Sequence, residues 1–449
     1  MNKQNIVIYL LTSFILTCNC AFAANLDSII KKSEINETST IAVSVKDAKS
    51  GRVVYEYNEH KLMNPASVLK IFTMKSAYDE LGKDYVFQTT VFADKNNNLY
   101  IKLGADPSLS TASLKTLMSN VKENYKKQVK DIIIDSSIID DKQWGIGWMW
   151  DDDTNSLLPK YSPYSVNENK IDVSITPGTN GRMPEVKTKG NYHMTIVNLL
   201  KNGNNNSISF ERKPWVSGDM TYVTGTIKSP ASYKLPVSSP QRHFINTLNS
   251  VLSSSGIKYT GTIKTAPVPS GLNKIASVSS EPLDQLLANT LKNSNNFYSE
   301  MIFKTAGGHY AKSQGTTQNG VEMFNQYFSS IKSDKPVIVD ACGISRNDLL
   351  SADWITSALN KIYNEENSEE FISLLPKPIE GTLSDRLLNI SLKLRAKTGT
   401  ASGISSIAGY IDTKSNKKYS FAILIQNHAM SVLDVKKFED ELINEIYKM

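Results

Sequence analysis

Ser67 and Lys70 are the residues whose types and spacing best suit nucleophilic catalysis. A serine hydroxyl is a poor nucleophile until a neighbouring base takes its proton, and a lysine amine can do so if it is partly neutral. The pair stands at the start of a long apolar run, which predicts a buried helix from Ser67 to Leu81, ending at Gly82. There, free N–H groups favour developing negative charge, and a lysine one turn along shares the face of the serine.

Spacing alone does not identify this pair, because serine-x-x-lysine recurs at Ser28, Ser119, Ser255, Ser329 and Ser415. A competing interpretation makes Ser67 a helix N-cap and Lys70 a surface residue with an apolar stem. Two further elements favour catalysis, since Ser294-Asn295-Asn296 and then Lys397-Thr398-Gly399 follow in the chain. Each is common by itself, and the partial matches are Ser165/Asn167, Ser345/Asn347 and Lys49-Ser50-Gly51.

The three elements together supply the groups that acyl transfer needs. Lys397 is a second cation and would disfavour the charge on Lys70. Ser294 can pass a proton to the leaving group, while Asn296 can hold a substrate amide. The presence of all three elements therefore favours a catalytic role for Ser67.

The Lys397 element also suits a substrate with a free carboxylate. Thr398 and Thr400 can donate hydrogen bonds to that carboxylate beside the Lys397 ammonium. Gly399 lacks a Cβ and lets the substrate backbone approach the strand. The backbone N–H groups of Ser67 and Thr400 would form the oxyanion hole.

The elements around these residues predict an α+β fold with a large β-rich inserted region. Short strand-like pieces broken by Asn, Gly, Pro and Ser fill residues 88–232. The flanking parts, 24–87 and 233–449, are assigned to one domain. They contain predicted strands at 41–45, 53–57, 407–411 and 419–425, a strand carrying Lys397, and helices at 241–252, 283–291, 297–306, 352–364 and the C-terminus.

Residues 1–23 have the features of a secretory signal peptide. Lys3 precedes an apolar run over residues 6–16, and Ala21-Phe22-Ala23 is a small-x-small cleavage pattern. A retained anchor is the competing interpretation, but the run is shorter than the roughly 20 apolar residues of a membrane span. After cleavage, Cys342 is the only cysteine, so no intramolecular disulfide is possible.

Composition argues against several other classes of function. The formal net charge of +6 is spread along the sequence, which disfavours a nucleic-acid-binding stripe. The chain has five histidines, with no Cys/His ligand cluster and no phosphate-binding glycine loop. We therefore expect no metal, no other cofactor and no nucleic-acid partner.

The ordered trio is the signature of penicillin-binding proteins and class A β-lactamases. The chain resembles the class C low-molecular-mass penicillin-binding proteins, the D-alanyl-D-alanine carboxypeptidase/endopeptidase family, which carries extra domains between the first two elements. The resemblance implies a penicillin-binding/β-lactamase-like transpeptidase domain, in which helices flank an antiparallel sheet. It covers nearly all the mature chain through the segments 64–67, 106–109, 147–152, 161–163, 340–346, 380–383 and 409–411.

The segment 340–346 looks like the family loop whose arginine contacts the diaminopimelate side chain of stem peptides. The family's second contact is an aspartate after a Trp-x-Trp segment. Carried over, these residues are Arg346 and Asp152, with Asp151 and Asp153 as alternatives for the aspartate. A pair of opposite charges suits the zwitterionic end of that side chain.

Two departures from the family pattern leave the groups of the mechanism in place. Ala341-Cys342 replaces glycine-serine, which could alter the diaminopimelate pocket, and Asn295 replaces the commoner aspartate. We expect Cys342 to be a small buried residue.

The resemblance implies a periplasmic serine DD-peptidase that hydrolyses peptidoglycan stem peptides and cross-links through an acyl-enzyme on Ser67. β-Lactams would acylate the same serine. The rivals are a β-lactamase and, from another class, a catalytically idle sensor or peptidoglycan-binding protein. A homodimer and a loose membrane association stay open.

Overall fold

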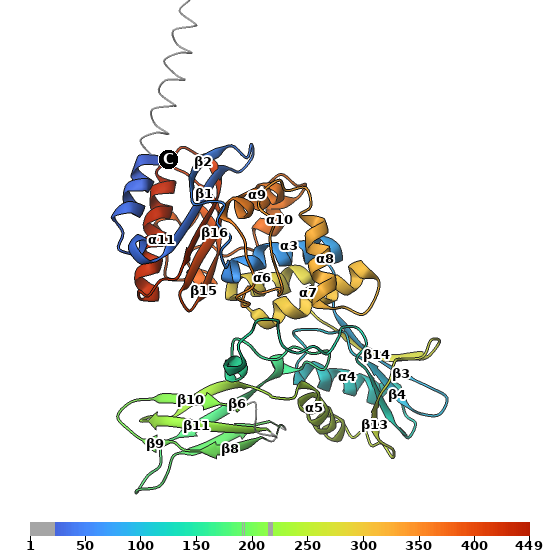
Figure 1. Cartoon of the computed structure of the whole chain (residues 1–449). Helices are drawn as coiled ribbons and strands as arrows, with labels where there is room; N and C mark the ends of the chain where they lie inside the picture. Colours follow the sequence, from blue (N-terminus) through green and yellow to red (C-terminus); the bar gives the residue numbers. More distant parts are fainter. Residues whose placement is uncertain (1–22, 191, 193, 214–218) are drawn as a thin grey trace, which may run out of the picture. The chain divides into compact units, whose positions relative to one another are not determined.

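The computed structural model describes residues 23–190, 192, 194–213 and 219–449, and Figure 1 labels its elements. Apart from Ala23, the predicted signal peptide lies outside the described residues. The chain divides into two compact units, each assembled from separate stretches. The first unit combines residues up to Ser76 with Leu287–Ser294 and Phe324–Met449, and the second combines Ala77–Leu286 with Asn295–Met323.

An antiparallel five-stranded sheet, in the order β15-β16-β17-β1-β2, forms the centre of the first unit. Its strands are β1 (Thr40–Asp47), β2 (Val53–Tyr57), β15 (Leu394–Ala401), β16 (Ile404–Asp412) and β17 (Lys418–Gln426). Eight of the nine β16 residues are buried, as expected for a central strand covered on both faces. Helices α11 (Val432–Tyr447) and α9 (Ala352–Tyr363) lie on opposite faces of this sheet (Figure 1).

Two apolar groups hold these layers together. On the α11 face, Leu442 and Ile446 pack with Ile407 and Ile423 of the sheet. A separate aromatic cluster joins Phe72 of helix α3 (Lys70–Leu81) to Trp354 of α9, with ring centroids 5.0 Å apart. The start of α3 is therefore fixed within the first unit.

The second unit contains a five-stranded mixed sheet, in the order β13-β5-β4-β3-β14. Its strands are β3 (Gln88–Ala93), β4 (Leu99–Lys102), β5 (Ile132–Asp135), β13 (Ile263–Thr265) and β14 (Asn273–Ser279). Helices α4 (Thr111–Asn124) and α5 (Pro240–Ser254) share its apolar core through Leu117 and Leu248.

Two smaller sheets complete the β-rich part of the second unit, and an apolar core is shared between them. One has the order β12-β6-β7 and consists of β6 (Lys170–Thr176), β7 (Glu185–Lys189) and β12 (Ala231–Pro236). The other consists of β8 (Thr195–Asn198), β9 (Lys201–Asn202), β10 (Ser207–Glu211) and β11 (Met220–Ile227). The α+β fold with a β-rich region is thus confirmed.

The other labelled α-helices are α2 (Ile35–Thr38), α6 (Leu283–Asn293), α7 (Asn296–Ala311), α8 (Thr317–Tyr327) and α10 (Ser368–Ile372), and residues 23–32 are also helical. Helices α4 and α8 were not predicted from the sequence. The apolar spacing of Leu114, Leu117, Met118 and Val121 behind the Ser110 cap is nevertheless typical of a helix. No helix in the described ranges is long and apolar enough to cross a membrane.

Strand pairing also corrects a domain boundary. β12 pairs with β6, β13 with β5 and β14 with β3. Residues 233–286 therefore belong to the second unit, and the predicted boundary at residue 233 lies too early in the chain. Local texture cannot reveal this, because each partner strand lies far away in the sequence.

Candidate active site

Ser67 lies on a single turn of 3-10 helix, Ala66–Leu69, immediately before α3. The Lys70 side chain is fully buried, and its Nζ donates 2.8 Å hydrogen bonds to Ser67 Oγ and to the Cys342 carbonyl. The predicted nucleophile and the predicted base are thus in direct contact, which is the geometry that proton transfer needs.

The loop that supplies the Cys342 carbonyl is organised by one carboxylate. Asp340 accepts hydrogen bonds of 2.6 to 3.1 Å from four backbone N–H groups, those of Cys342, Gly343, Ile344 and Ser345. The neighbouring Asp348 is buried, and burial, followed by the Asp340 charge, raises the pKa of its carboxyl well above the ordinary value. Asp340 therefore fixes the loop backbone that contacts Lys70.

The same loop packs directly against the nucleophile segment. Gly343 has a φ of +79°, and a Cβ there would lie 1.9 Å from the Ala66 carbonyl oxygen. Asn64 joins the two segments, because its Nδ2 donates to the Ser345 carbonyl at 2.7 Å and its Oδ1 accepts from the Ala66 N–H at 2.9 Å. The loop and the residues before Ser67 are thus held as one body.

A second serine–lysine pair lies in the same unit. Ser294 follows α6 with a left-handed φ of 56°, and Lys397 Nζ donates to its Oγ at 2.9 Å and to the Thr398 carbonyl at 2.7 Å. Burial, and then the charge of Lys70, holds the pKa of Lys397 well below its ordinary value. Since Lys397 donates to the Ser294 oxygen, the hydroxyl proton of Ser294 can point elsewhere.

Strand β15 is an edge strand of its sheet. The Ala396 N–H points away from β16 and donates to the Pro376 carbonyl at 2.9 Å. Because N–H directions alternate along a strand, those of Thr398 and Thr400 point to the same outer edge. This direction suits the predicted role of the Thr400 N–H in an oxyanion hole.

Gly399 brings β15 and the nucleophile close together. A Cβ at this position would lie 2.3 Å from Ser406 Oγ, 2.8 Å from the Pro65 carbonyl oxygen and 2.9 Å from the Ser67 nitrogen. The sequence predicted that Gly399 leaves room for the substrate backbone. In the structure, the close approach of Ser406, Pro65 and Ser67 already requires a residue without a side chain at this position.

The hydroxyl groups after Lys397 differ in their contacts. Thr398 Oγ1 donates to Thr382 Oγ1 at 2.7 Å, a contact the sequence did not reveal. A substrate carboxylate would have to compete for that hydroxyl. Thr400 is exposed, and its hydroxyl makes no hydrogen bond to any residue that the structure describes. Thr400 is therefore the more available donor.

Three predicted binding residues lie in different units. Asn296 belongs to the second unit, where it begins α7 and its Nδ2 donates to the Leu157 carbonyl at 3.0 Å. Asp152, also in the second unit, accepts a 3.5 Å contact from Asn155. Arg346 is exposed in the first unit and donates to the Ser402 carbonyl at 3.1 Å.

The acidic run 151–153 contains one residue with a structural role. Asp153 forms ion pairs with Arg212 and Lys160, each at 3.2 Å. Asp152 and the exposed Asp151 have no ion pair among the described residues. The structure therefore disfavours Asp153 as the substrate-binding aspartate and leaves the neighbouring two.

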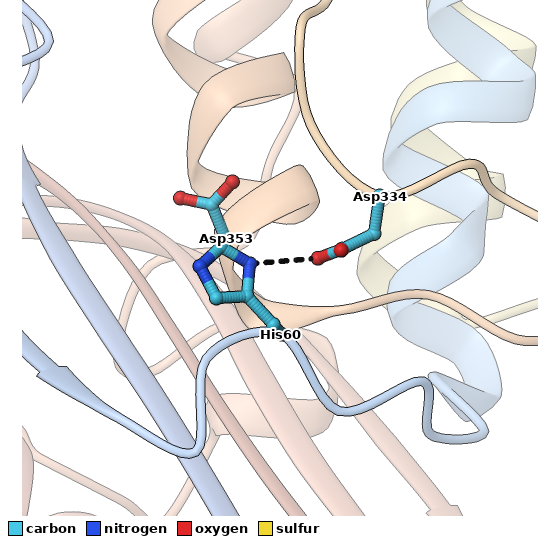
Figure 2. A group of neighbouring side chains, drawn as sticks. All are labelled: His60, Asp334 and Asp353. Atoms are coloured by element: carbon cyan, nitrogen blue, oxygen red, sulfur yellow. Dashed lines mark hydrogen bonds and ion pairs between the residues drawn. The ribbon is translucent and has the colours of Figure 1, made fainter.

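A histidine–carboxylate group lies elsewhere in the first unit. His60 Nδ1 lies 3.0 Å from Asp334 Oδ2, and Asp353 lies beside them (Figure 2). The Asp353 carboxylate already accepts hydrogen bonds from Lys46 Nζ and Ser333 Oγ. The group is accounted for as an ion-pair network.

Comparisons with known proteins identify the family of the chain. The model of the D-Ala-D-Ala carboxypeptidase 3 (S13) family matches residues 22–445. The chain is 22% identical to the D-alanyl-D-alanine carboxypeptidase DacB of Haemophilus influenzae, over the full length of both chains. It is 25% identical to the D-alanyl-D-alanine carboxypeptidase of Actinomadura sp. strain R39, over 90% of this chain and 81% of that protein.

A solved structure shows the same fold. The crystal structure of penicillin-binding protein 4 from Haemophilus influenzae has a TM-score of 0.85 to this chain, with 22% identity, and the match covers 95% of this chain and 100% of that one. The fold and site define a class C low-molecular-mass penicillin-binding protein. The chain belongs to the D-Ala-D-Ala carboxypeptidase 3 (S13) family.

Proposed function

We propose that this chain is a serine DD-peptidase whose acyl-enzyme forms on Ser67. The observation that carries the proposal is the pair of serine–lysine contacts, Ser67–Lys70 and Ser294–Lys397, within one unit. Family membership and relatives named as D-alanyl-D-alanine carboxypeptidases support the same activity.

Acylation begins when neutral Lys70 takes the Ser67 proton and Ser67 Oγ attacks the carbonyl carbon of the penultimate D-alanine. The N–H groups of Ser67 and Thr400 bind the oxyanion of the tetrahedral intermediate. Collapse breaks the C–N bond, and Ser294 donates its proton to the leaving amine. Lys397, hydrogen-bonded to Ser294, then restores that proton.

Lys397 also keeps Lys70 effective as a base. The two amines repel each other electrostatically, so both being charged at once is unfavourable in this buried site. The proton on Lys70 then returns to Lys397, and neutral Lys70 takes a proton from water as the water oxygen attacks the ester carbonyl of the acyl-enzyme. Collapse breaks the ester C–O bond, Lys70 gives that proton to Ser67 Oγ, and the shortened peptide is released. A leaving D-alanine makes the reaction a carboxypeptidation, and a leaving cross-linked side chain makes it an endopeptidation.

The substrate contacts are proposed from the sequence motifs. Thr400 and Lys397 would bind the terminal carboxylate, and Asn296 the substrate amide. Arg346 and Asp152 would bind the zwitterionic end of a diaminopimelate side chain. The proposed location is the periplasm.

One experiment separates this proposal from its rivals. The purified mature chain and its Ser67→Ala variant are incubated with labelled penicillin and with diaminopimelate-containing muropeptides. Retained label on the wild type, with release of D-alanine or cleavage of cross-links, is expected, and both should vanish in the variant. Rapid turnover of penicillin would identify a β-lactamase, and a wild type without label or cleavage would contradict the mechanism.

A further inference from the structure

The second unit contains an open cavity of about 580 Å³ that the mechanism above does not use. The segment Pro107–Thr111, the start of β6, and side chains of β7, β12, α5 and α7 line it. The volume falls in the range of roughly 300–1,000 Å³ that is common for ligand sites. Most lining residues carry polar or charged side chains, and the lining surface is about equally polar and apolar, which suits a ligand with both hydrogen-bonding and apolar groups.

One wall of the cavity carries an excess of positive charge. The outward face of the three-stranded sheet places Asp172 in register with Lys234 on one neighbour and Lys189 on the other. Asp172 pairs with Lys234 at 2.6 Å, and Glu168 pairs with Lys170 at 2.8 Å. Three lysines and two carboxylates thus line the cavity, which leaves one excess positive charge.

Lys189 supplies that excess charge. Its ammonium makes no ion pair or side-chain hydrogen bond with any residue in the described part of the chain. Lys187, on the same face of β7, pairs with Glu185 at 2.8 Å and does not line the cavity. Strand β7 therefore places Lys189 at the cavity and Lys187, which is paired with Glu185, outside it.

The inner wall holds a buried imidazole. His243 on α5 is only 3% exposed, and one of its ring nitrogens faces the Val166 backbone, which leaves the other without a hydrogen bond within the described residues. Burial lowers the pKa of His243 to about 4, although the backbone hydrogen bond with Val166 opposes the shift, so the ring is neutral near pH 7. A buried polar group of this kind costs free energy until a partner reaches it.

The cavity is connected to the Ser294-Asn295-Asn296 element through α7. Asn295 caps this helix by accepting a 3.1 Å hydrogen bond from the Tyr298 N–H, and its Nδ2 lies 3.5 Å from Glu168 Oε2. Tyr298 and Glu168 both line the cavity. Asn295 directly follows Ser294 in the chain, so a ligand in the cavity would contact residues that position the start of α7.

We propose that this cavity is a second, non-catalytic binding site for a carboxylate-bearing peptide, and specifically for a neighbouring stem peptide of the polymer cleaved at Ser67. The inference rests on the proposed function for the identity of the polymer. Lys189 binds a peptide carboxylate, and the remaining ring nitrogen of His243 accepts a hydrogen bond from a backbone N–H of the ligand. The charged lining residues disfavour a wholly apolar ligand.

The test uses full-length mature protein already acylated by penicillin, so that Ser67 is blocked. Calorimetry measures binding of a disaccharide tetrapeptide, of the same compound with amidated carboxyl groups, and of a chitooligosaccharide without peptide. We expect binding of the tetrapeptide, at least tenfold weaker binding in Lys189→Glu, and unchanged binding in the control Lys187→Glu. Amidation should weaken binding, and the glycan should not bind.

Kinetics supply a second measurement. Lys189→Glu should lower kcat/KM several-fold for a cross-linked muropeptide dimer while leaving it unchanged for a short peptide ending in D-Ala-D-Ala, and Lys187→Glu should change neither. No tetrapeptide binding to acylated wild type, equal loss in both variants, or equal binding of the peptide-free glycan would overturn the inference. Penicillin labelling of the wild type tests the proposed function separately.

Discussion

At the scale of single residues, the site is defined by two buried lysines that each donate to a serine hydroxyl. Lys70 and Lys397 are both fully buried, but Lys70 donates to Ser67 Oγ and Lys397 to Ser294 Oγ, so the proposed roles of the two lysines differ. Each amine therefore combines a favourable hydrogen bond with an unfavourable burial of charge. This combination leads to two predictions.

Lys70→Arg should slow acylation of Ser67 by labelled penicillin at least ~100-fold. Arginine keeps the charge and hydrogen-bonding capacity but does not lose its proton in proteins, so general base catalysis is lost. The control is Lys122→Arg. Lys122 has the same serine-x-x-lysine spacing from Ser119, but its side chain lies on the surface. Equal rates in both variants would show that Lys70 is not the base.

Lys397→Met should raise the melting temperature near pH 7 by a few degrees while slowing acylation. The folded-state pKa of Lys397 lies below its unfolded value of 10.5, so the unfolded chain binds more protons between these two values. Wild-type stability is therefore lost as the pH falls through that window, and methionine removes this cost. Melting curves at pH 7 and pH 10 should show the gain shrinking at the higher pH; a gain that grows with pH would contradict this account.

At the scale of elements, the nucleophile segment, the loop 340–345 and strand β15 are held together by close backbone contacts. Gly343 faces the Ala66 carbonyl and Gly399 faces the Ser67 nitrogen, with no room for a Cβ at either position. Asn64 adds hydrogen bonds between the first two segments. The position of Ser67 thus depends on how three elements pack.

Gly343→Ala should lower both thermal stability and the acylation rate more than Gly82→Ala. Both glycines have positive φ, +79° and +83°, so both substitutions carry the ~1–2 kcal/mol cost of a left-handed alanine. Only at Gly343 does the new Cβ also meet backbone, whereas nothing lies within 4 Å at Gly82. Similar losses in the two variants, measured by melting and penicillin labelling, would argue against close packing as the determinant.

At the scale of the whole molecule, the chain forms two compact units with separate apolar cores. Both serine–lysine pairs lie in the first unit, and the cavity with Lys189 and His243 lies in the second. The chain passes between the units several times, and Ser294 and Asn295 are the last and first residues at one passage. Damage to one core should therefore affect different activities from damage to the other.

Leu235→Ala, in the core shared by the two smaller sheets, should increase protease sensitivity of the second unit without changing the penicillin acylation rate. Ile423→Ala, in the core under β15 and β16, should reduce that rate. Both side chains are fully buried, and such truncations typically cost ~2–5 kcal/mol. Equal acylation rates in the two variants would show that the cores do not divide the activities in this way.

The sequence by itself determined the family, the α+β class and the order of the three motifs. Ser67 and Lys70 lie one helical turn apart, so local spacing sets their contact. The later motifs at 294–296 and 397–399 distinguished this pair from the five other serine-x-x-lysine matches. The hairpin of β1 and β2 and the helices α5, α9 and α11 were predicted because their patterns are local.

Tertiary structure decided what depends on distant segments. The bond from Lys397 to Ser294, the Cys342 carbonyl at Lys70 and the use of Asp153 in ion pairs each join residues far apart in the chain. The boundary at residue 233 was misplaced because β13 and β14 pair with strands more than a hundred residues earlier. Long-range strand pairing and side-chain packing leave no local pattern in the sequence, so only the folded chain reveals them.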